Sequence, residues 1–289
     1  RDGLGRQRRH RKLQRGQSVK LKRAIGRRLW QAFARSRILG GYMTNIIAHR
    51  GFSGMYPENS LLAFQKALEL GVDGIELDVH LSRDGQVVIA HDEKLDRVAG
   101  RRNRIQDLSA SELQQVEIRG GSLDERGQTV PTLAQYFRLV KDKNVFTNIE
   151  LKNTLGCKGL EREVLTLIDA FGLRERVLFS SFNHHSLSKL LKLAPEMRCA
   201  CLVACRLERG GEYAKTRGFS FVNPHYAALD DESIAEIHGA GVGIQAWTVD
   251  DPAVIQYLYS RDVFGVITNR PDIAISVRAG ARGAEVRDR

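Results

Sequence analysis

The sequence has no long hydrophobic run. No apolar stretch approaches the roughly 18 residues that a membrane-spanning helix needs, and the basic N-terminus lacks the apolar segment of a secretory signal. Phosphate-binding glycine motifs of the G-x-G-x-x-G or Walker type are also missing. Of the 289 residues, 42% are hydrophobic and 27% are charged, which is typical of a soluble globular protein of one large or two ordinary domains. We therefore expect a cytoplasmic location.

Cysteine is scarce, and three of the four cysteines form one C-x-C-x3-C cluster at Cys199, Cys201 and Cys205. A zinc site of this kind would need a second cluster, which is missing. We interpret the cluster as small apolar residues on a buried strand. Nothing in the cysteine pattern requires an oxidising compartment.

The basic excess is confined to the N-terminal extension. Residues 1–42 contain 14 lysines and arginines and one acidic residue, whereas residues 43–289 contain 31 lysines and arginines and 33 acidic residues. The body is therefore close to neutral and gives no electrostatic argument for a nucleic-acid partner.

Within this extension, residues 1–18 are polar and are predicted to be disordered. Apolar residues then recur every four positions over 19–39, which predicts a basic amphipathic helix. Such a helix could make peripheral contact with a membrane or dock on a partner. Alternatively, Met43 is the natural start and the extension is upstream sequence. Both interpretations stay open, and the sequence sets no oligomeric state.

From Ile46 onward, short apolar runs alternate with helical patterns. The expected strands are 45–49, 74–81, 86–91, 145–151, 177–181, 198–204, 219–223, 242–248 and 264–268; the expected helices include 58–70, 109–117, 132–141, 160–171, 184–193, 230–240 and 251–260. This alternation predicts an α/β fold with a parallel sheet, best matched by a TIM (β/α)8 barrel over 43–275, followed by a tail over 276–289. A doubly wound open sheet is the second choice.

Two features interrupt the regular alternation. The strands 74–81 and 86–91 are joined only by "SRDGQ", which is too short for a helical crossover and allows a hairpin. The polar segment 92–131 follows the third strand, and we interpret it as an insertion near the strand ends, where barrel enzymes place their active-site loops.

Unusual polar groups stand on four successive strand candidates. The first ends on His49-Arg50, and the third on His91-Asp92; Glu76 and Asp78 alternate with aliphatic residues on the second, as do Glu150 and Lys152 on the fourth. Singly, each has an ordinary explanation, such as a hydrogen-bonded histidine, a solvated strand or a local salt bridge. Their recurrence at one end of successive strands favours a functional site.

These residue types indicate a specific chemistry. Three carboxylates on covered strands need a partner, most simply a hard divalent cation such as Mg²⁺ or Ca²⁺. A cation beside arginine and lysine suits a phosphate-like transition state. Two histidines can serve as general base and general acid. The inferred reaction is metal-assisted cleavage of a phosphodiester.

The motifs "AHRGFSGMYPENSLLAF", "GVDGIELDVHLSRDGQVVIAHDEKLDR", "IELK", "VLFSSF", "QAWTVDD" and "GVITNRPD" appear in the order typical of glycerophosphodiester phosphodiesterases. This resemblance covers roughly residues 45–275. It implies a TIM barrel that hydrolyses a small glycerophosphodiester to glycerol 3-phosphate and an alcohol.

Carried over by motif, the resemblance implies roles for ten residues. The catalytic pair would be His49 and His91, the metal ligands Glu76, Asp78 and Glu150, and the substrate or phosphate contacts Arg50, Lys152, Glu58, Asn59 and Trp247. For Trp247, a role as a buried aromatic residue of the core is an equally good interpretation. Ser60 replaces the more frequent threonine, and Asn269 stands where an aspartate is common, which alters one charge near a strand end.

Three other functions compete with this one. A lysophospholipase D-like enzyme would use the same centre at a membrane surface, and the amphipathic extension slightly favours it. A non-catalytic binding barrel would have no chemical reason to keep both histidines and all three acids. A nucleic-acid phosphodiesterase is opposed by the near-neutral body.

Overall fold

The computed structural model describes residues 44–152 and 159–287, with side chains described as far as residue 281. The basic extension and its expected amphipathic helix lie outside the described residues. Nine strands are present in the described part: β1 (Asn45–His49), β2 (Gly74–Leu81), β3 (Val87–Ile89), β4 (Phe146–Leu151), β5 (Val177–Ser181), β6 (Arg198–Val203), β7 (Phe221–Pro224), β8 (Gly243–Ala246) and β9 (Gly265–Thr268).

Eight of these strands close into a parallel barrel. The order runs β1-β9-β8-β7-β6-β5-β4-β2, and β1 pairs with β2 to close the ring. The remaining strand, β3, pairs antiparallel with β2 and belongs to no crossover, so it stays outside the ring. The hairpin expected across "SRDGQ" is confirmed, and it explains how nine strand candidates make an eight-stranded barrel. The prediction of a TIM barrel is correct.

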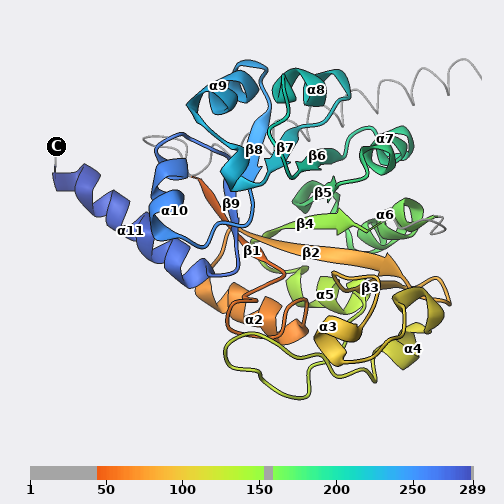
Figure 1. Cartoon of the computed structure of the whole chain (residues 1–289). Coiled ribbons are helices and arrows are strands. Elements are labelled where there is room, and N and C mark those ends of the chain that lie inside the picture. Colours follow the sequence, from red (N-terminus) through yellow and green to blue (C-terminus); the bar gives the residue numbers. More distant parts are fainter. Residues whose placement is uncertain (1–43, 153–158, 288–289) are drawn as a thin grey trace, which may run out of the picture. The chain divides into compact units, whose positions relative to one another are not determined.

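Helices surround the barrel (Figure 1). The helices of the described residues are α2 (Leu61–Leu70), α3 (Asp96–Ala99), α4 (Ala110–Leu113), α5 (Leu133–Val140), α6 (Leu160–Phe171), α7 (His184–Leu193), α8 (Gly210–Thr216), α9 (Asp231–Gly239), α10 (Pro252–Tyr259) and α11 (Pro271–Arg287), with short 3-10 turns η1 (Ile105–Asp107), η2 (Arg174–Arg176) and η3 (Tyr226–Ala228). Of these, α3 and α4 belong to the inserted segment described below. Sequence analysis did not expect α8, which is only seven residues long and opens on two glycines. It also did not expect α11, which crosses the boundary drawn at residue 275.

Capping explains where two helices begin. The Ser60 side chain accepts from the backbone N–H of Ala63, so α2 starts at Leu61, three residues later than expected. The preceding residues form a turn, in which Asn59 has a φ of 57°. In α4, Ser109 and Glu112 form a reciprocal capping box, yet the helix ends at Leu113 although the pattern predicted 109–117.

The inserted segment between β3 and α5 has a hydrophobic core of its own. This core combines Val88 of β3 with buried residues of the segment, which are Ala90, Leu95, Ile105, Ala110, Leu113, Val116, Ile118 and Val130. These apolar residues follow no regular period, which is why the sequence suggested only a polar excursion. The segment with α3 and α4 lies beside β3 and α5 in Figure 1. It is thus a packed unit that can hold side chains in fixed positions.

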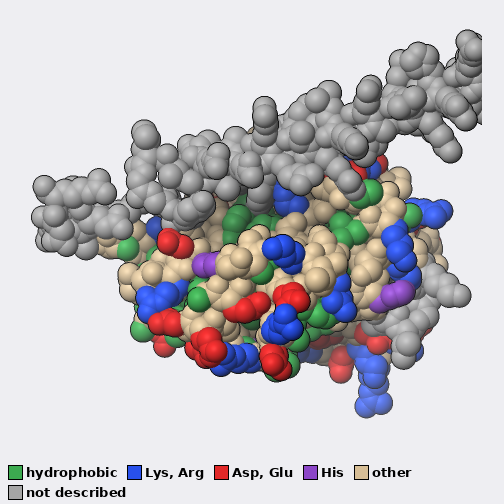
Figure 2. All heavy atoms as spheres, turned by 90° about the horizontal axis from the view of Figure 1, so that it is seen from above, with side chains coloured by type: hydrophobic (Ala, Val, Ile, Leu, Met, Phe, Trp, Pro, Cys, Tyr) green, Lys and Arg blue, Asp and Glu red, His purple; other side chains and the backbone are tan. Residues whose placement is uncertain are grey.

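The outer surface mixes both signs of charge. On the face shown in Figure 2, acidic and basic side chains are interspersed, in keeping with the near balance of charges in residues 43–289. Within the described part of the chain, none of the helices has the length and apolar character to cross a membrane.

Cys199 and Cys201 are buried on β6, as expected, whereas Cys205 lies beyond the strand and is exposed.

Candidate active site at the carboxyl ends of the strands

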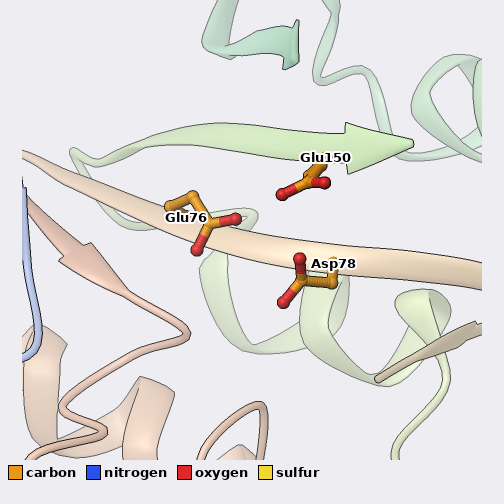
Figure 3. Close-up of side chains that lie close together, drawn as sticks. All are labelled: Glu76, Asp78 and Glu150. Atoms are coloured by element: carbon orange, nitrogen blue, oxygen red, sulfur yellow. The ribbon is translucent and has the colours of Figure 1, made fainter. Parts of the chain in front are cut away.

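Strand register brings the three predicted acids together. His49 on β1 pairs with Glu76 on β2, and Asp78 on β2 pairs with Glu150 on β4. Side chains two residues apart on a strand share one face, so these residues point into the same space. Figure 3 shows Glu76, Asp78 and Glu150 grouped on the two neighbouring strands.

The acidic cluster of Glu76, Asp78 and Glu150 is compact and buried. One carboxylate oxygen from each residue lies within 4.8 Å of the others, and the residues are 4%, 0% and 8% exposed. Oxygen donors at this spacing fit a hard divalent cation such as Mg²⁺ or Ca²⁺. Within the described residues, this is the group of acids, histidines or cysteines that could hold a metal ion.

Two cations border the acidic cluster. Lys152 Nζ lies 2.6 Å from Glu150 Oε1 and 3.2 Å from Asp78 Oδ1, while Arg50 Nε lies 3.4 Å from Asp78 Oδ2. If all three carboxylates are ionised, these groups carry one net negative charge, and a divalent cation bound by them would make the net charge positive. A positive centre suits a phosphodiester, which carries one negative charge.

The acids differ in how strongly they hold a proton. Burial and the neighbouring carboxylates raise the pKa of Glu76 well above its ordinary value, and burial with Asp78 raises the pKa of Glu150 to about 7. Burial also opposes ionisation of Asp78, but Lys152 and Arg50 outweigh it and hold its pKa far below the usual range. Without a cation, the centre thus combines one firmly ionised acid, Asp78, with two acids that hold a proton more strongly than usual.

The chain turns sharply where β1 ends. Arg50 has a φ of 54° and Gly51 a φ of 77°. A Cβ on Gly51 would lie 2.7 Å from the carbonyl carbon of Ala63, so this position accepts only glycine without a shift of α2. The turn aims the Arg50 backbone N–H at Glu76 Oε2, at 3.0 Å. Strained backbone of this kind concentrates at functional sites.

His49 is held from the neighbouring strand β9, which pairs with β1. Its Nδ1 lies 2.6 Å from Asn269 Oδ1, just beyond β9. Asn269 donates its side-chain amide to Asp250 Oδ2 at 2.7 Å, and its backbone N–H to Asp250 Oδ1 at 2.8 Å. Burial and the Arg50 charge lower the pKa of His49 to about 4. Sequence reasoning noted Asn269 only as a departure and missed its partner Asp250.

His91 lies just beyond β3 and has a charged partner. Its Nδ1 is 2.6 Å from Asp92 Oδ1, and the pKa of the histidine is lowered, chiefly by burial. Asp92 accepts in turn from Arg97 Nε at 2.6 Å. Asp92 and Arg97 both stand in the motif segment "HDEKLDR". The sequence therefore contained a signal for them, but sequence analysis assigned neither residue a role.

The remaining expected residues divide into two groups. Asn59 donates to Asp78 Oδ2 at 2.8 Å, and Glu58 accepts from Arg50 Nη1 at 3.0 Å, so both belong to the acidic centre. Trp247, beyond β8, instead donates to the Asn223 carbonyl at 2.7 Å and packs edge-to-face with Phe182 at 5.5 Å. It is half-buried, and Phe182 is 49% exposed.

A model of the Glycerophosphoryl diester phosphodiesterase family matches residues 49–273 of this chain. The chain belongs to the glycerophosphodiester phosphodiesterase family. A glycerophosphodiester phosphodiesterase from Caldanaerobacter subterraneus subsp. tengcongensis is 36% identical over 241 residues, covering 82% of this chain and 99% of the relative. One from Bacillus altitudinis is also 36% identical over 241 residues, with 82% and 98% covered. The resemblance read from the motifs is confirmed.

A solved structure shares the family fold. An Oleispira antarctica phosphodiesterase, solved in complex with the product sn-glycerol-3-phosphate, aligns with a TM-score of 0.72 and 29% identity, covering 82% of this chain and 97% of that one. As a glycerophosphodiester phosphodiesterase, the chain places its acids and both histidine-bearing segments at the carboxyl side of the barrel strands, where TIM-barrel enzymes build their active sites.

Proposed function

We propose that this chain hydrolyses glycerophosphodiesters to glycerol 3-phosphate and an alcohol with the help of Mg²⁺ or Ca²⁺. The observation that carries the proposal is the buried cluster of Glu76, Asp78 and Glu150, flanked by Arg50 and Lys152. The product bound to the Oleispira antarctica relative supports the same substrate class.

Glu76, Asp78 and Glu150 would hold the cation. A bound divalent cation neutralises charge on phosphate oxygens and orients the diester. Arg50 and Lys152 carry permanent positive charge at the edge of the same centre, because the nearby acids raise the pKa of both above the ordinary value against the effect of burial. We assign both to the phosphate, for which guanidinium and ammonium groups are suited.

His49 is assigned as the proton acceptor. Asn269 uses its NH₂ group on Asp250, so its Oδ1 faces His49 and must accept. Nδ1 of His49 therefore carries the proton, and Nε2 keeps a lone pair on the side of Glu76, 3.9 Å away. The low pKa keeps this imidazole neutral near pH 7, so it can take a proton from the attacking hydroxyl or water.

His91 is assigned as the proton donor to the departing alcohol. Asp92 is an acceptor when ionised; burial opposes its ionisation, but Arg97 and His91 still hold its pKa below the ordinary value. Its carboxylate thus fixes Nδ1–H on His91 and stabilises the imidazolium form. The Asp92 carboxylate favours the protonated form of His91, and it acts against burial, which lowers the pKa of this histidine overall; the neutral amide partner of His49 brings no such negative charge.

The remaining assignments concern residues that hold the charged groups in place and one that contacts the substrate. Asn59 and Glu58 shape the site through Asp78 and Arg50, respectively. Trp247 would pack on the glycerol or alcohol portion of the substrate.

The test is release of glycerol 3-phosphate from glycerophosphocholine with Mg²⁺, with Ca²⁺ and with a chelator. Turnover should require a cation, and His49→Ala and His91→Ala should each lower kcat by about 10²–10⁴-fold. Chelator-resistant turnover would refute the role of the acidic cluster. Absence of turnover with either metal, in protein shown to be folded, would refute the substrate.

A lysophospholipase D-like activity is the second candidate, favoured by the exposed ring of Phe182 beside Trp247. An apolar surface near the barrel mouth could contact an acyl chain. Hydrolysis of lysophosphatidylcholine in preference to glycerophosphocholine, reduced in Phe182→Ser, would establish this alternative.

A further inference from the structure

Arg97 lies on the short helix α3 of the inserted segment and holds two carboxylates at once. Its Nη1 and Nη2 atoms each donate to the Glu58 carboxylate at 2.7 Å, and its Nε donates to Asp92 Oδ2 at 2.6 Å. Two parallel bonds from one guanidinium to one carboxylate fix both distance and orientation. Arg97 therefore ties the turn before α2 to the loop after β3.

Each of these carboxylates holds one group of the proposed reaction. Asp92 Oδ1 lies 2.6 Å from His91 Nδ1, and Glu58 Oε1 accepts from Arg50 Nη1 at 3.0 Å. The interactions described for Arg97 end at Glu58 and Asp92. An effect of Arg97 on the reaction must therefore pass through these two acids.

The backbone of α3 is held independently of the Arg97 side chain. Leu95, just before the helix, is 1% exposed in the core of the inserted segment. The Val98 carbonyl accepts from the Arg119 backbone N–H at 2.8 Å. The Arg97 side chain itself is 48% exposed. Removing its guanidinium should thus leave the fold intact and release only Glu58 and Asp92.

We infer that Arg97 is a positioning residue that aims His91 at the leaving group through Asp92 and steadies Arg50 through Glu58. Without it, two carboxylates lose their shared cation, repel each other and turn toward water. His91 then loses its fixed ring orientation, and Arg50 loses one of its two acidic partners. The inference rests on the proposed role of His91 as proton donor.

The test compares two leaving groups. Choline leaves glycerophosphocholine as a poor alkoxide that needs a proton, whereas nitrophenol leaves a nitrophenyl glycerophosphodiester as a stable anion. Arg97→Gln should lower kcat on glycerophosphocholine by about tenfold to a hundredfold, since small displacements of a catalytic group cost this much. Its kcat on the nitrophenyl diester should change little, and KM should rise for both substrates through Arg50. Arg97→Lys keeps the charge but not the two-point contact, so its kcat on glycerophosphocholine should lie between the values of the wild type and Arg97→Gln.

Arg104→Gln is the matched control. Arg104 is a partly exposed arginine of the same segment that pairs with Glu93, and its loss should affect neither substrate. Thermal melting should show Arg97→Gln as stable as Arg104→Gln. An Arg97→Gln enzyme that behaves like Arg104→Gln, or that loses both activities equally, would overturn the inference.

His91→Ala separates this inference from the proposed function. Equal losses on both diesters in His91→Ala would refute the donor role and the inference with it. Absence of wild-type turnover on either diester would refute the proposed function. A selective loss in His91→Ala without one in Arg97→Gln would overturn only the role of Arg97.

Discussion

Replacing Asn269 by aspartate should destabilise the protein in a pH-dependent way. Asn269 Nδ2 donates to Asp250 Oδ2 at 2.7 Å, so the substitution sets two carboxylate oxygens against each other in place of a hydrogen bond. Two unit charges about 4 Å apart repel by roughly 4 kcal/mol at an effective dielectric constant near 20. The new acid can avoid this repulsion by taking up a proton in the folded state. Keeping it protonated costs about 1.4 kcal/mol of folding free energy for each pH unit above its ordinary pKa of about 4, which sets an upper limit on the loss. We therefore expect a loss of about 2–4 kcal/mol at pH 8.

The direction with pH follows from linkage. The pKa of the carboxyl introduced at position 269 would be raised in the folded state, so the variant should match the wild type below about pH 4, where the acid is protonated in both states. Stability should then fall as pH rises toward the raised pKa. At pH 8 the Tm should drop by about 5–15 °C, measured by calorimetry of the metal-free protein.

A second substitution should rescue this variant. When Asn269→Asp is combined with Asp250→Asn, the pair again has one carboxylate and one amide, and the amide oxygen introduced at position 250 can still accept from the backbone N–H of residue 269. Stability at pH 8 should return to within about 1 kcal/mol of wild type, and Asp250→Asn alone completes the cycle. His49 would then face a carboxylate, so its pKa should rise and the acidic limb of the pH–rate profile should move to higher pH. An Asn269→Asp protein as stable as wild type at pH 8, or no rescue by the double substitution, would refute this reasoning.

Three further outcomes are expected. Because the pKa of Glu150 is raised to about 7 in the folded protein, the metal-free enzyme should lose stability as pH rises from about 4 to 7. Mg²⁺ or Ca²⁺ should therefore raise the Tm more at pH 8 than at pH 5. A Glu150→Gln variant that keeps the full pH dependence would contradict this expectation. Tyr136→Phe removes a buried hydroxyl 2.9 Å from Thr147 Oγ1. It should lower the free energy of unfolding, measured in urea, by about 1 kcal/mol and leave kcat unchanged. A loss of activity without a loss of stability would contradict this expectation. Gly51→Ala would place a Cβ 2.7 Å from the Ala63 carbonyl carbon and should cost about 1–3 kcal/mol while lowering activity through Arg50, and a melting curve identical to wild type would exclude the strain.

Much of the barrel could be read from local patterns. The helices predicted over 160–171 and 184–193 coincide with α6 and α7, because each shows a clear apolar period between turn residues. The short helix α8 escaped prediction, because seven residues beginning with two glycines show too little period and propensity. The core of the inserted segment escaped for a related reason, since its apolar residues are scattered among polar ones.

Much of the acidic centre could be read in the same way. Glu76 and Asp78 alternate with aliphatic residues on one strand, and alternation alone places both on one face. Parallel strands that all end at one edge then bring Glu150 to the same place. The expected strand 242–248 included Trp247, whereas in the structure this residue lies just beyond β8. Its neighbour Phe182 could not be foreseen, because contact between the two rings depends on how separate loops approach.

The sequence by itself determined the barrel, the shared face of its acids and the family, because alternation, strand ends and motif order are properties of short segments. Only the tertiary structure decided that β3 stays outside the ring, that Arg97 clamps Glu58 and Asp92, and that Asn269 orients His49 from 220 residues away. These contacts depend on the closure of the barrel and on the packing of the inserted segment. Both arise from many weak interactions between distant parts of the chain, which no local pattern encodes.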